Sequence, residues 1–378
     1  DIVPVRWRVV RNVRPKYSCR VCEKIVQAPT PVSAVARGKA TFATLAHIVV
    51  SKFDHHLPLY RQAGMMAAQG LDIDRSTLAG WTGQAAALLD PIVTRIRDEV
   101  LKTDKIHADD TPVPVLDPGR GKTATGRLWV YAADDQASGS TAPRATWYRF
   151  TPDRTAAHPM AHLAGFRGFL QADAYAGYDG LYRGGVTEVA CWAHFRRKVF
   201  DLHERSPTPL TTDILERIGQ LYAIEAEVRG QPPDVRCRSR QENSRPLVDA
   251  LREVLDAALR HLSPRCDMAK AIAYGTKRWP ALSRFLEDGR LEIDNNIAER
   301  ALRGVAVGRR NWLFAGSRAG GERAAAIYTV IQTCKANGVD PHAYIADVIA
   351  RVAGDWPASQ WDELMPWNWS PEPARLAA

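Results

Sequence analysis

The sequence predicts an α/β protein in which a mixed sheet is followed by an all-helical segment. Short apolar runs typical of strands are confined to residues 104–205, whereas the residues on both sides have helical patterns. Two of the apolar runs end in an aspartate, Asp109 and Asp173, and a third acidic residue, Glu299, lies on a helical pattern further along the chain. Carboxylates at the ends of strands gather at a sheet edge, so these residues are the first candidates for a functional site.

Composition narrows the class of protein. The chain has 378 residues, of which 46% are hydrophobic and 25% charged, and no apolar run reaches the length of a membrane span. The net charge of +9 favours a nucleic acid as partner, and six cysteines without clustering fit a reducing cytoplasm. We therefore expect a cytoplasmic, nucleoid-associated protein with no membrane partner. Because the chain begins with Asp1, we also expect N-terminal sequence to be missing.

Residues 1–30 form a basic segment. Basic and apolar residues alternate over residues 5–9, which predicts a strand with one basic face. Arg6, Arg8 and Arg14 are candidate contacts for DNA phosphates.

Cys19 and Cys22 supply half of a zinc site in the same segment. A structural zinc takes four ligands, and no second cysteine pair lies nearby. Three readings stay open: a partner pair upstream of the chain, His55 and His56 as substitutes, or no metal.

Residues 31–103 are helical in pattern and contain a possible helix-turn-helix. Gly70 would begin the turn and Asp74 would cap the second helix, whose first residues are Arg75, Ser76 and Thr77. These three would contact DNA. The alternative is an ordinary pair of antiparallel helices, and the local pattern favours neither.

Residues 104–205 predict three strands that can form a meander, followed by alternating helices and strands. The strands are expected at residues 106–115, 127–133, 145–150, 168–173 and 187–193, and the helices at 155–165, 177–183 and 194–205. This is the order of a ribonuclease-H-like fold, in which the first and fourth strands are neighbours. Asp109 and Asp173 would then lie side by side.

Residues 206–285 are charged, are interrupted by prolines at 207, 209, 232 and 233, and have no strand pattern, which predicts a helical insertion. Asp173 and Glu299 are 126 residues apart, nearly twice the 64 residues between Asp109 and Asp173, as an insertion would require. Residues 286–336 would complete the core, and residues 337–378 would form a C-terminal packing unit.

The predicted helix around Glu299 begins near Asp294. Asp294 is a suitable N-cap, and Asn295, Glu299 and Arg303 recur every four residues as one polar stripe. Glu299 is either a metal ligand or a surface partner of Arg303. Arg300 and Arg303 are candidate DNA contacts.

The junction at residues 191–194 carries a cysteine and a histidine, which more often means a buried thiol and a hydrogen-bonded imidazole than a metal site. His194, Arg196 and Arg197 at a helix start suit phosphate contact. The phosphate-loop motif is excluded, because residues 119–123 lack its first glycine.

Asp109, Asp173 and Glu299 form a coherent set of metal ligands. Three carboxylates can hold two hard cations, and such a pair about 4 Å apart promotes in-line attack on a phosphodiester. The arginines around them suit a polyanionic substrate.

Several long motifs in the right order resemble those of the bacterial insertion-sequence-66 family of transposases. They cover residues 107–116, 121–131, 170–178, 191–198, 292–303 and 308–316, with further similarity at 17–22, 57–61 and 366–369. The resemblance implies a DDE transposase with a ribonuclease-H-like core, two Mg²⁺ ions and an N-terminal zinc-binding segment. It places the triad on Asp109, Asp173 and Glu299, and chooses Asp109 over Asp110. The family's upstream cysteine pair and N-terminal helical region have no counterpart in this chain, so the zinc site is partial.

We therefore expect cleavage of DNA at the ends of an insertion sequence, followed by joining of those ends to target DNA. The expected partners are the terminal inverted repeats, target DNA, further copies of the chain assembled on DNA, and accessory proteins of the same element. The alternatives are a transposase-derived DNA-binding regulator that is no longer catalytic, and a ribonuclease-H-like nuclease. The three acidic residues argue against the first, and the N-terminal DNA-binding segment and the insertion argue against the second.

Overall fold

The computed structural model describes residues 7–35 and 38–371, which divide into two compact units. Unit 1 contains residues up to 93, residues 307–313 and residues from 326 onward, and unit 2 contains residues 94–306 and 314–325. Three helices have residues in both units: α3 (Arg75–Lys102), α12 (Asn296–Trp312) and α13 (Arg318–Ala336).

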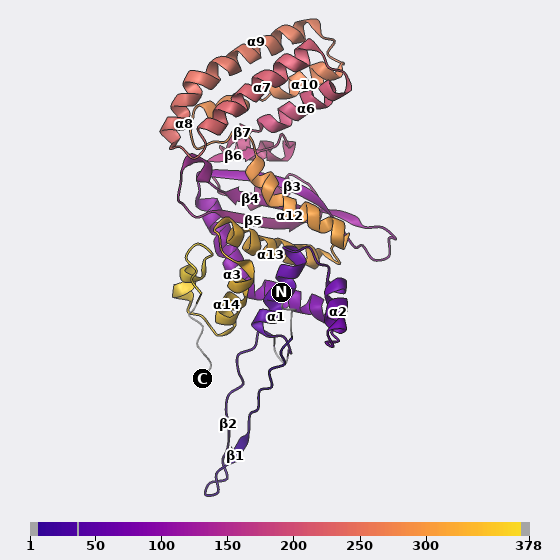
Figure 1. The fold of residues 1–378 in the computed structure, drawn as a ribbon, viewed down its shortest axis with the longest axis vertical. Helices are drawn as coiled ribbons and strands as arrows, with labels where there is room; N and C mark the ends of the chain where they lie inside the picture. The colour runs from indigo at the N-terminus through magenta and orange to yellow at the C-terminus, as the bar shows by residue number, and fades with distance from the viewer. Residues whose placement is uncertain (1–6, 36–37, 372–378) are drawn as a thin grey trace, which may run out of the picture. The chain divides into compact units, whose positions relative to one another are not determined.

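A five-stranded mixed sheet forms the centre of unit 2 (Figure 1). Its strands are β3 (Lys105–Val115), β4 (Ala124–Ala133), β5 (Ala145–Thr151), β6 (Phe169–Ala172) and β7 (Thr187–Ala190). They lie in the order β5-β4-β3-β6-β7, with antiparallel pairing among the first three and parallel pairing of β6 with both β3 and β7. The sequence predicts this adjacency of its first and fourth strands, β3 and β6.

A helix follows each of the last three strands, as the pattern indicates, and the one between β6 and β7 connects two parallel neighbours. The helices are α4 (Ala157–His162), α5 (Asp179–Arg183) and α6 (Trp192–Arg205), with 3₁₀ turns at Gln136–Ser138 and Ala176–Tyr178. The strands form because apolar side chains of β3 and β4, such as Ile106, Trp129 and Tyr131, are fully buried between the sheet and its helices. The start of β3 and all of β6 are largely buried, and both strands lead into an aspartate at the same sheet edge.

Residues 206–285 are helical, as predicted. The helices are α7 (Pro209–Glu227), α8 (Pro233–Ser239), α9 (Arg245–His261), α10 (Asp267–Thr276) and α11 (Trp279–Ser283), with a π-helical turn at Arg240–Ser244 and a 3₁₀ turn at Arg284–Leu286. Figure 1 shows α6 alongside α7, α9 and α10. One apolar core joins them, in which Trp192 and Phe195 of α6 pack with Ile218 of α7 and Leu251 of α9. The insertion is therefore built onto the core rather than tethered to it.

A buried ion cluster closes the base of the insertion. Arg240 donates to both oxygens of Glu225, at 2.6 and 2.7 Å, and to the carbonyl oxygens of Phe285 and Leu291. Arg236, which is 1% exposed, lies 3.3 Å from Glu225 and 2.9 Å from a Glu292 oxygen. These bonds tie the insertion to the chain that leads into α12.

Unit 1 contains α1 (Phe42–Phe53), α2 (Leu59–Ala68), α14 (Pro341–Ala353) and a 3₁₀ turn at Ala358–Leu364. A two-stranded hairpin of β1 (Lys16–Ser18) and β2 (Ile25–Gln27) precedes them. The predicted strand at residues 5–9 is wrong where it can be compared, because residues 7–9 have no strand structure, while residues 5 and 6 lie outside the described residues. A strand needs a partner for its backbone groups, and the pairing in this segment goes to β1 and β2 instead.

The predicted turn between two helices is present between α2 and α3. Gly70 has φ of +82°, and the Asp74 carboxylate accepts a hydrogen bond from the backbone of Ser76 at 2.7 Å, which caps α3. Arg75, Ser76 and Thr77 are exposed. The second helix of this motif is α3, which has 28 residues and continues from unit 1 into unit 2. Within the described residues, none of the helices has the length and apolar character to cross a membrane.

Candidate functional site

Asp109 and Asp173 lie at matching positions of two neighbouring parallel strands. Ala108 of β3 pairs with Ala172 of β6, and each aspartate is the next residue. Asp173 Oδ1 accepts a hydrogen bond from the backbone of Tyr175 at 3.1 Å. The parallel register therefore brings the two predicted aspartates side by side, Asp173 at the carboxyl end of β6 and Asp109 within the central strand β3.

Two buried amides hold the start of α12 against the same strands. Asn295 Nδ2 donates to the carbonyl of Ala108 at 2.9 Å, and its Oδ1 accepts from Nδ1 of His107 at 3.1 Å. Gln171 of β6 donates to the carbonyl of Asp294 at 2.9 Å. Asn295, His107 and Gln171 are all fully buried. Asn295 is therefore buried, unlike the exposed Glu299 and Arg303 of the predicted polar stripe, because its side chain turns into the sheet.

Asp294 caps the chain just ahead of α12, since its Oδ1 accepts from the backbone of Asn296 at 3.0 Å. Glu299 follows in the first turn of the helix. His194 Nδ1 of α6 lies 4.0 Å from Glu299 Oε1, a distance at which a protonated imidazole forms an ion pair.

A cavity of about 590 Å³ joins these elements. Asp109 lies on one side and Glu299 on another, while Asp173 is not among the residues that line it. His194, Arg197 and several residues of α12 complete its lining.

The carboxylates influence one another. Burial raises the pKa of Asp109 to about 7, and the charges of Asp173, Asp110 and Glu299 act in the same direction. A hydrogen bond from the Asp110 backbone to Asp109 Oδ1, at 2.7 Å, opposes this effect. Burial is the main cause of the shift, and a cation bound at Asp109 would favour its charged form.

Asp110 is also among the residues that line the cavity, but arginines pair with its carboxylate. Its Oδ2 accepts from Arg127 at 3.0 Å, and its Oδ1 accepts from Arg154 at 2.9 and 2.8 Å. The Asp110 side chain is only 2% exposed. Because both of its oxygens are committed, Asp110 is a poor candidate for a metal ligand.

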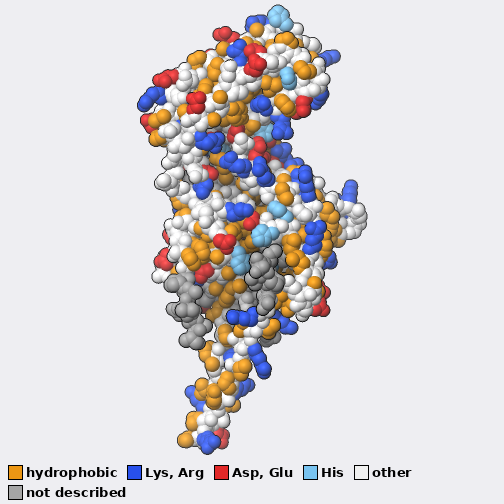
Figure 2. Space-filling model, in the orientation of Figure 1, with side chains coloured by type: hydrophobic (Ala, Val, Ile, Leu, Met, Phe, Trp, Pro, Cys, Tyr) orange, Lys and Arg blue, Asp and Glu red, His pale blue; other side chains and the backbone are white. Residues whose placement is uncertain are grey.

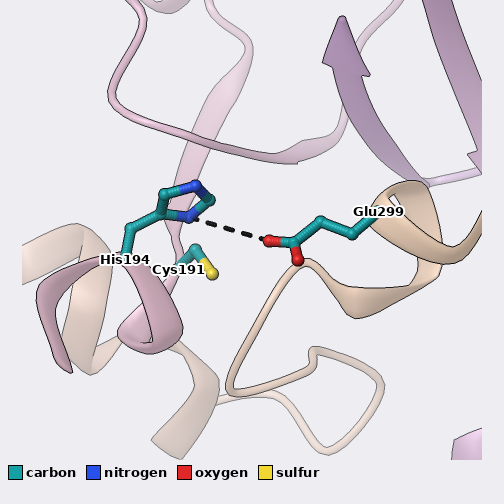
Figure 3. A group of neighbouring side chains, drawn as sticks. All are labelled: Cys191, His194 and Glu299. Carbon is teal, nitrogen blue, oxygen red and sulfur yellow. Dashed lines mark ion pairs between the residues drawn. The ribbon is translucent and has the colours of Figure 1, made fainter. Parts of the chain in front are cut away.

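A second group of potential ligands lies beside the cavity (Figure 3). One ligand atom each from Cys191, His194 and Glu299 lie within 4.8 Å of one another. Burial raises the pKa of the Cys191 thiol to about 12, and its sulfur accepts from the backbone of Asn295 at 3.3 Å. A thiol must lose its proton to bind a metal, so Cys191 serves better as a buried acceptor, as the sequence indicates.

The donor chemistry of the carboxylates fits a hard divalent cation. Asp109, Asp173 and Glu299 offer only oxygens, which Mg²⁺ prefers. The sulfur and nitrogen of the Cys191 group suit softer metals. Glu299 belongs to both groups, and the all-oxygen set is the better match to Mg²⁺.

Five predicted DNA contacts, His194 and four arginines, lie at or beside this cavity. Arg197, Arg300 and Arg303 line it, while Arg196 on the same helix as Arg197 lies over the Phe200 ring at 5.5 Å. All four arginines are exposed. Figure 2 shows basic side chains grouped around an indentation where acidic side chains also lie.

The other predicted contacts belong to unit 1. Arg75, Ser76 and Thr77 begin α3, and Arg8 is exposed, whereas Arg14 donates to the Ala28 carbonyl at 2.8 Å beside the hairpin. Arg6 lies outside the described residues.

Cys19 and Cys22 occupy the turn between β1 and β2 as free, exposed thiols. Hydrogen bonds from the backbone of Cys22 and Val21 lower the pKa of Cys19. Among the described residues, the single group of three potential ligands includes neither cysteine, so His55 and His56 do not complete their site.

Sequence reasoning missed the buried polar residues that support the site. His107 and Gln171 each precede a candidate aspartate by two residues, so each shares a strand face with it, and the two are paired in the register. That repeated polar-Ala-Asp pattern was the available signal. Nothing local marks Arg154, which reaches Asp110 from 44 residues away.

Comparison with known proteins agrees with these observations. The chain matches the model of the transposase IS66 family over residues 37–323 and that of the IS66 C-terminal element over residues 329–367. It is 41% identical to "Uncharacterized protein y4hP" and to "Uncharacterized protein y4qI" of Sinorhizobium fredii (strain NBRC 101917 / NGR234). The alignments cover 97% and 98% of this chain, and 69% and 70% of those proteins. The family is one of DNA-processing enzymes, and the chain belongs to the IS66 family of transposases.

Proposed function

We propose that this chain is a DDE transposase that cleaves DNA at the ends of an insertion sequence and joins those ends to target DNA. Asp109, Asp173 and Glu299 would hold two Mg²⁺ ions on a ribonuclease-H-like core. Such ions would make an oxygen nucleophile available and offset charge on the leaving oxygen of the phosphodiester.

The parallel register of β3 and β6 carries this proposal. It sets Asp109 beside Asp173, while Asn295 and Gln171 hold the start of the Glu299 helix on the same two strands. The family match agrees with it. A protein that only bound DNA would have no use for three carboxylates supported by buried amides.

The basic residues around the cavity would position the DNA. Arg197, Arg300 and Arg303 are exposed beside Asp109 and Glu299, where they would hold the phosphates on either side of the scissile bond. His194, which lines the same cavity, would orient the Glu299 carboxylate when its imidazole is protonated, because the two groups lie 4.0 Å apart.

The remaining roles follow the sequence. Arg75, Ser76 and Thr77 at the exposed start of α3 would read the terminal inverted repeats, and the basic N-terminal segment would bind phosphates nonspecifically. Cys19 and Cys22 would supply half of a zinc site whose other ligands lie outside the described residues. The protein would act on DNA in the cytoplasm as an oligomer, with accessory proteins of the same element.

The test is an assay of end cleavage and strand joining. Labelled duplexes that end in the terminal repeat of the encoding element are incubated with the chain and Mg²⁺. Asp109→Asn, Asp173→Asn and Glu299→Gln should each abolish both reactions, because each removes a metal-binding charge with little change of shape. Binding to the same DNA should stay within about threefold, since phosphate contacts come from basic side chains.

Asp213→Asn is the matched control, because Asp213 pairs only with Arg217 on the surface of α7 and should leave cleavage unchanged. Wild-type cleavage by any of the three carboxylate variants would overturn the triad. Binding without cleavage by the unaltered chain would favour the regulator, and cleavage without preference for ends and without joining would favour the nuclease.

A further inference from the structure

Arg154 lies between a buried aspartate and a candidate metal ligand. Its Nε and Nη2 donate to Asp110 Oδ1 at 2.9 and 2.8 Å, and the same Nη2 lies 3.7 Å from Asp173 Oδ2. The first contacts are charge-assisted hydrogen bonds, and the last is an ion pair too long to be one. Arg154 is therefore held by hydrogen bonds to Asp110, whereas its contact with Asp173 is a longer and weaker ion pair.

The position of the guanidinium is fixed by other groups as well. Its carbon lies 4.1 Å from the centre of the Tyr175 ring, and the Tyr175 hydroxyl donates to the Arg154 carbonyl. The Tyr175 backbone also holds the other oxygen of Asp173. Arg127 donates to Asp110 Oδ2, whereas Arg154 donates to Asp110 Oδ1. The structure thus keeps one positive charge beside Asp173.

We propose that Arg154 takes the electrostatic place of a cation beside Asp173 in the metal-free protein and competes with a divalent cation for that carboxylate. This inference rests on the proposed metal site. When a cation binds, Asp173 leaves the long contact with Arg154, while Arg154 stays on Asp110. Asp110 holds Arg154 in this position. This role explains why Asp110, the carboxylate next to the candidate ligand Asp109, is buried and paired on both of its oxygens.

The size of the competition follows from simple electrostatics. An arginine beside a carboxylate disfavours a competing cation such as a proton by about 10-fold to 1000-fold. The contact here is long and the Arg154 side chain is 35% exposed, so water screens it and the lower end applies. Removing the charge should tighten cation binding at Asp173 by about tenfold.

The experiment measures Mn²⁺ binding to the full chain by calorimetry, without DNA. Arg154→Gln should bind Mn²⁺ about tenfold more tightly than the unaltered chain, whereas Arg154→Lys, which keeps the charge, should stay within about threefold. Arg149→Gln is the matched control: Arg149 is exposed on β5 of the same sheet, and its loss should change affinity by less than about threefold.

Unchanged or weaker Mn²⁺ binding by Arg154→Gln would overturn the proposal, because a residue that merely supports the site would weaken binding when lost. Asp173→Asn distinguishes failure of the proposed metal site from failure of the proposed role of Arg154. If it leaves Mn²⁺ binding intact, the proposed metal site fails, and the role of Arg154 fails with it. If it weakens binding while Arg154→Gln does not tighten it, only the role of Arg154 fails. If Arg154→Gln unfolds, the double variant Asp110→Asn/Arg154→Gln is compared with the single variant Asp110→Asn. The double variant should bind Mn²⁺ more tightly than the single variant.

Discussion

Replacing Asn295 with alanine would test the contacts that hold α12 on the sheet. The side chain is fully buried, donates to the Ala108 carbonyl and accepts from His107 Nδ1. Alanine leaves both partners buried without these bonds. Each unsatisfied group of this kind costs about 1–3 kcal/mol, so the expected loss of stability is about 3 kcal/mol.

The assay is thermal unfolding of the full chain. For a unit of about 150–250 residues, which is the size of unit 2, each kcal/mol shifts the melting temperature by about 2–4 °C, so Asn295→Ala should lower it by about 6–12 °C. Asn296→Ala is the matched control, because Asn296 is the next residue, is exposed and bonds only locally to Asp294. Equal shifts for the two variants would refute the reasoning. Cleavage by Asn295→Ala should also fall about 100-fold, because a shift of about 1 Å in a catalytic group is enough for that loss.

Three further predictions concern stability and DNA binding. Glu225→Leu should destabilise the insertion by about 3–5 kcal/mol in a melting assay, because it leaves the buried Arg240 without its carboxylate, whereas Asp234→Ala on the surface of α8 should cost less than about 0.5 kcal/mol. Burial lowers the pKa of His162 to about 3. Below about pH 6.5 the unfolded chain therefore binds a proton at His162, whereas the folded protein does not. Because the proton favours the unfolded chain, stability must fall as the pH falls. At pH 5 this contribution is about 2 kcal/mol, and replacing His162 with asparagine should make the melting temperature less dependent on pH between about 5 and 7, an outcome that equal slopes would contradict. Arg303→Gln should reduce the slope of log affinity against log salt by about 0.9 for all DNA sequences alike, whereas an unchanged slope would exclude a phosphate contact.

Much of the sheet can be predicted from the sequence because its signals are local. Apolar runs bounded by turn residues indicate each of the five strands to within a few residues, and the order of strands and helices predicts that β3 and β6 are neighbours. That adjacency is enough to bring Asp109 and Asp173 together before any contact is known. The N-terminal alternation over residues 5–9 misled the same reasoning, because alternation predicts a strand without showing that a partner strand exists.

The supporting contacts of the site could not be predicted in this way. The sequence pattern places Asn295 in one polar stripe with Glu299 and Arg303, yet its side chain pairs with His107 from 188 residues away. Asp110 reads as an alternative ligand, yet two arginines from other elements occupy both of its oxygens.

The sequence by itself determined the strands, the helices and the chemical character of the candidate ligands, because these depend on residue type and spacing over a few positions. Only the tertiary structure decided which of the two adjacent aspartates is paired with arginines. It also decided which amides hold α12 to the sheet and where a positive charge lies beside Asp173. The physical reason is that hydrogen bonds and ion pairs depend on distance in space, and folding brings together groups whose separation along the chain carries no sign of their contact.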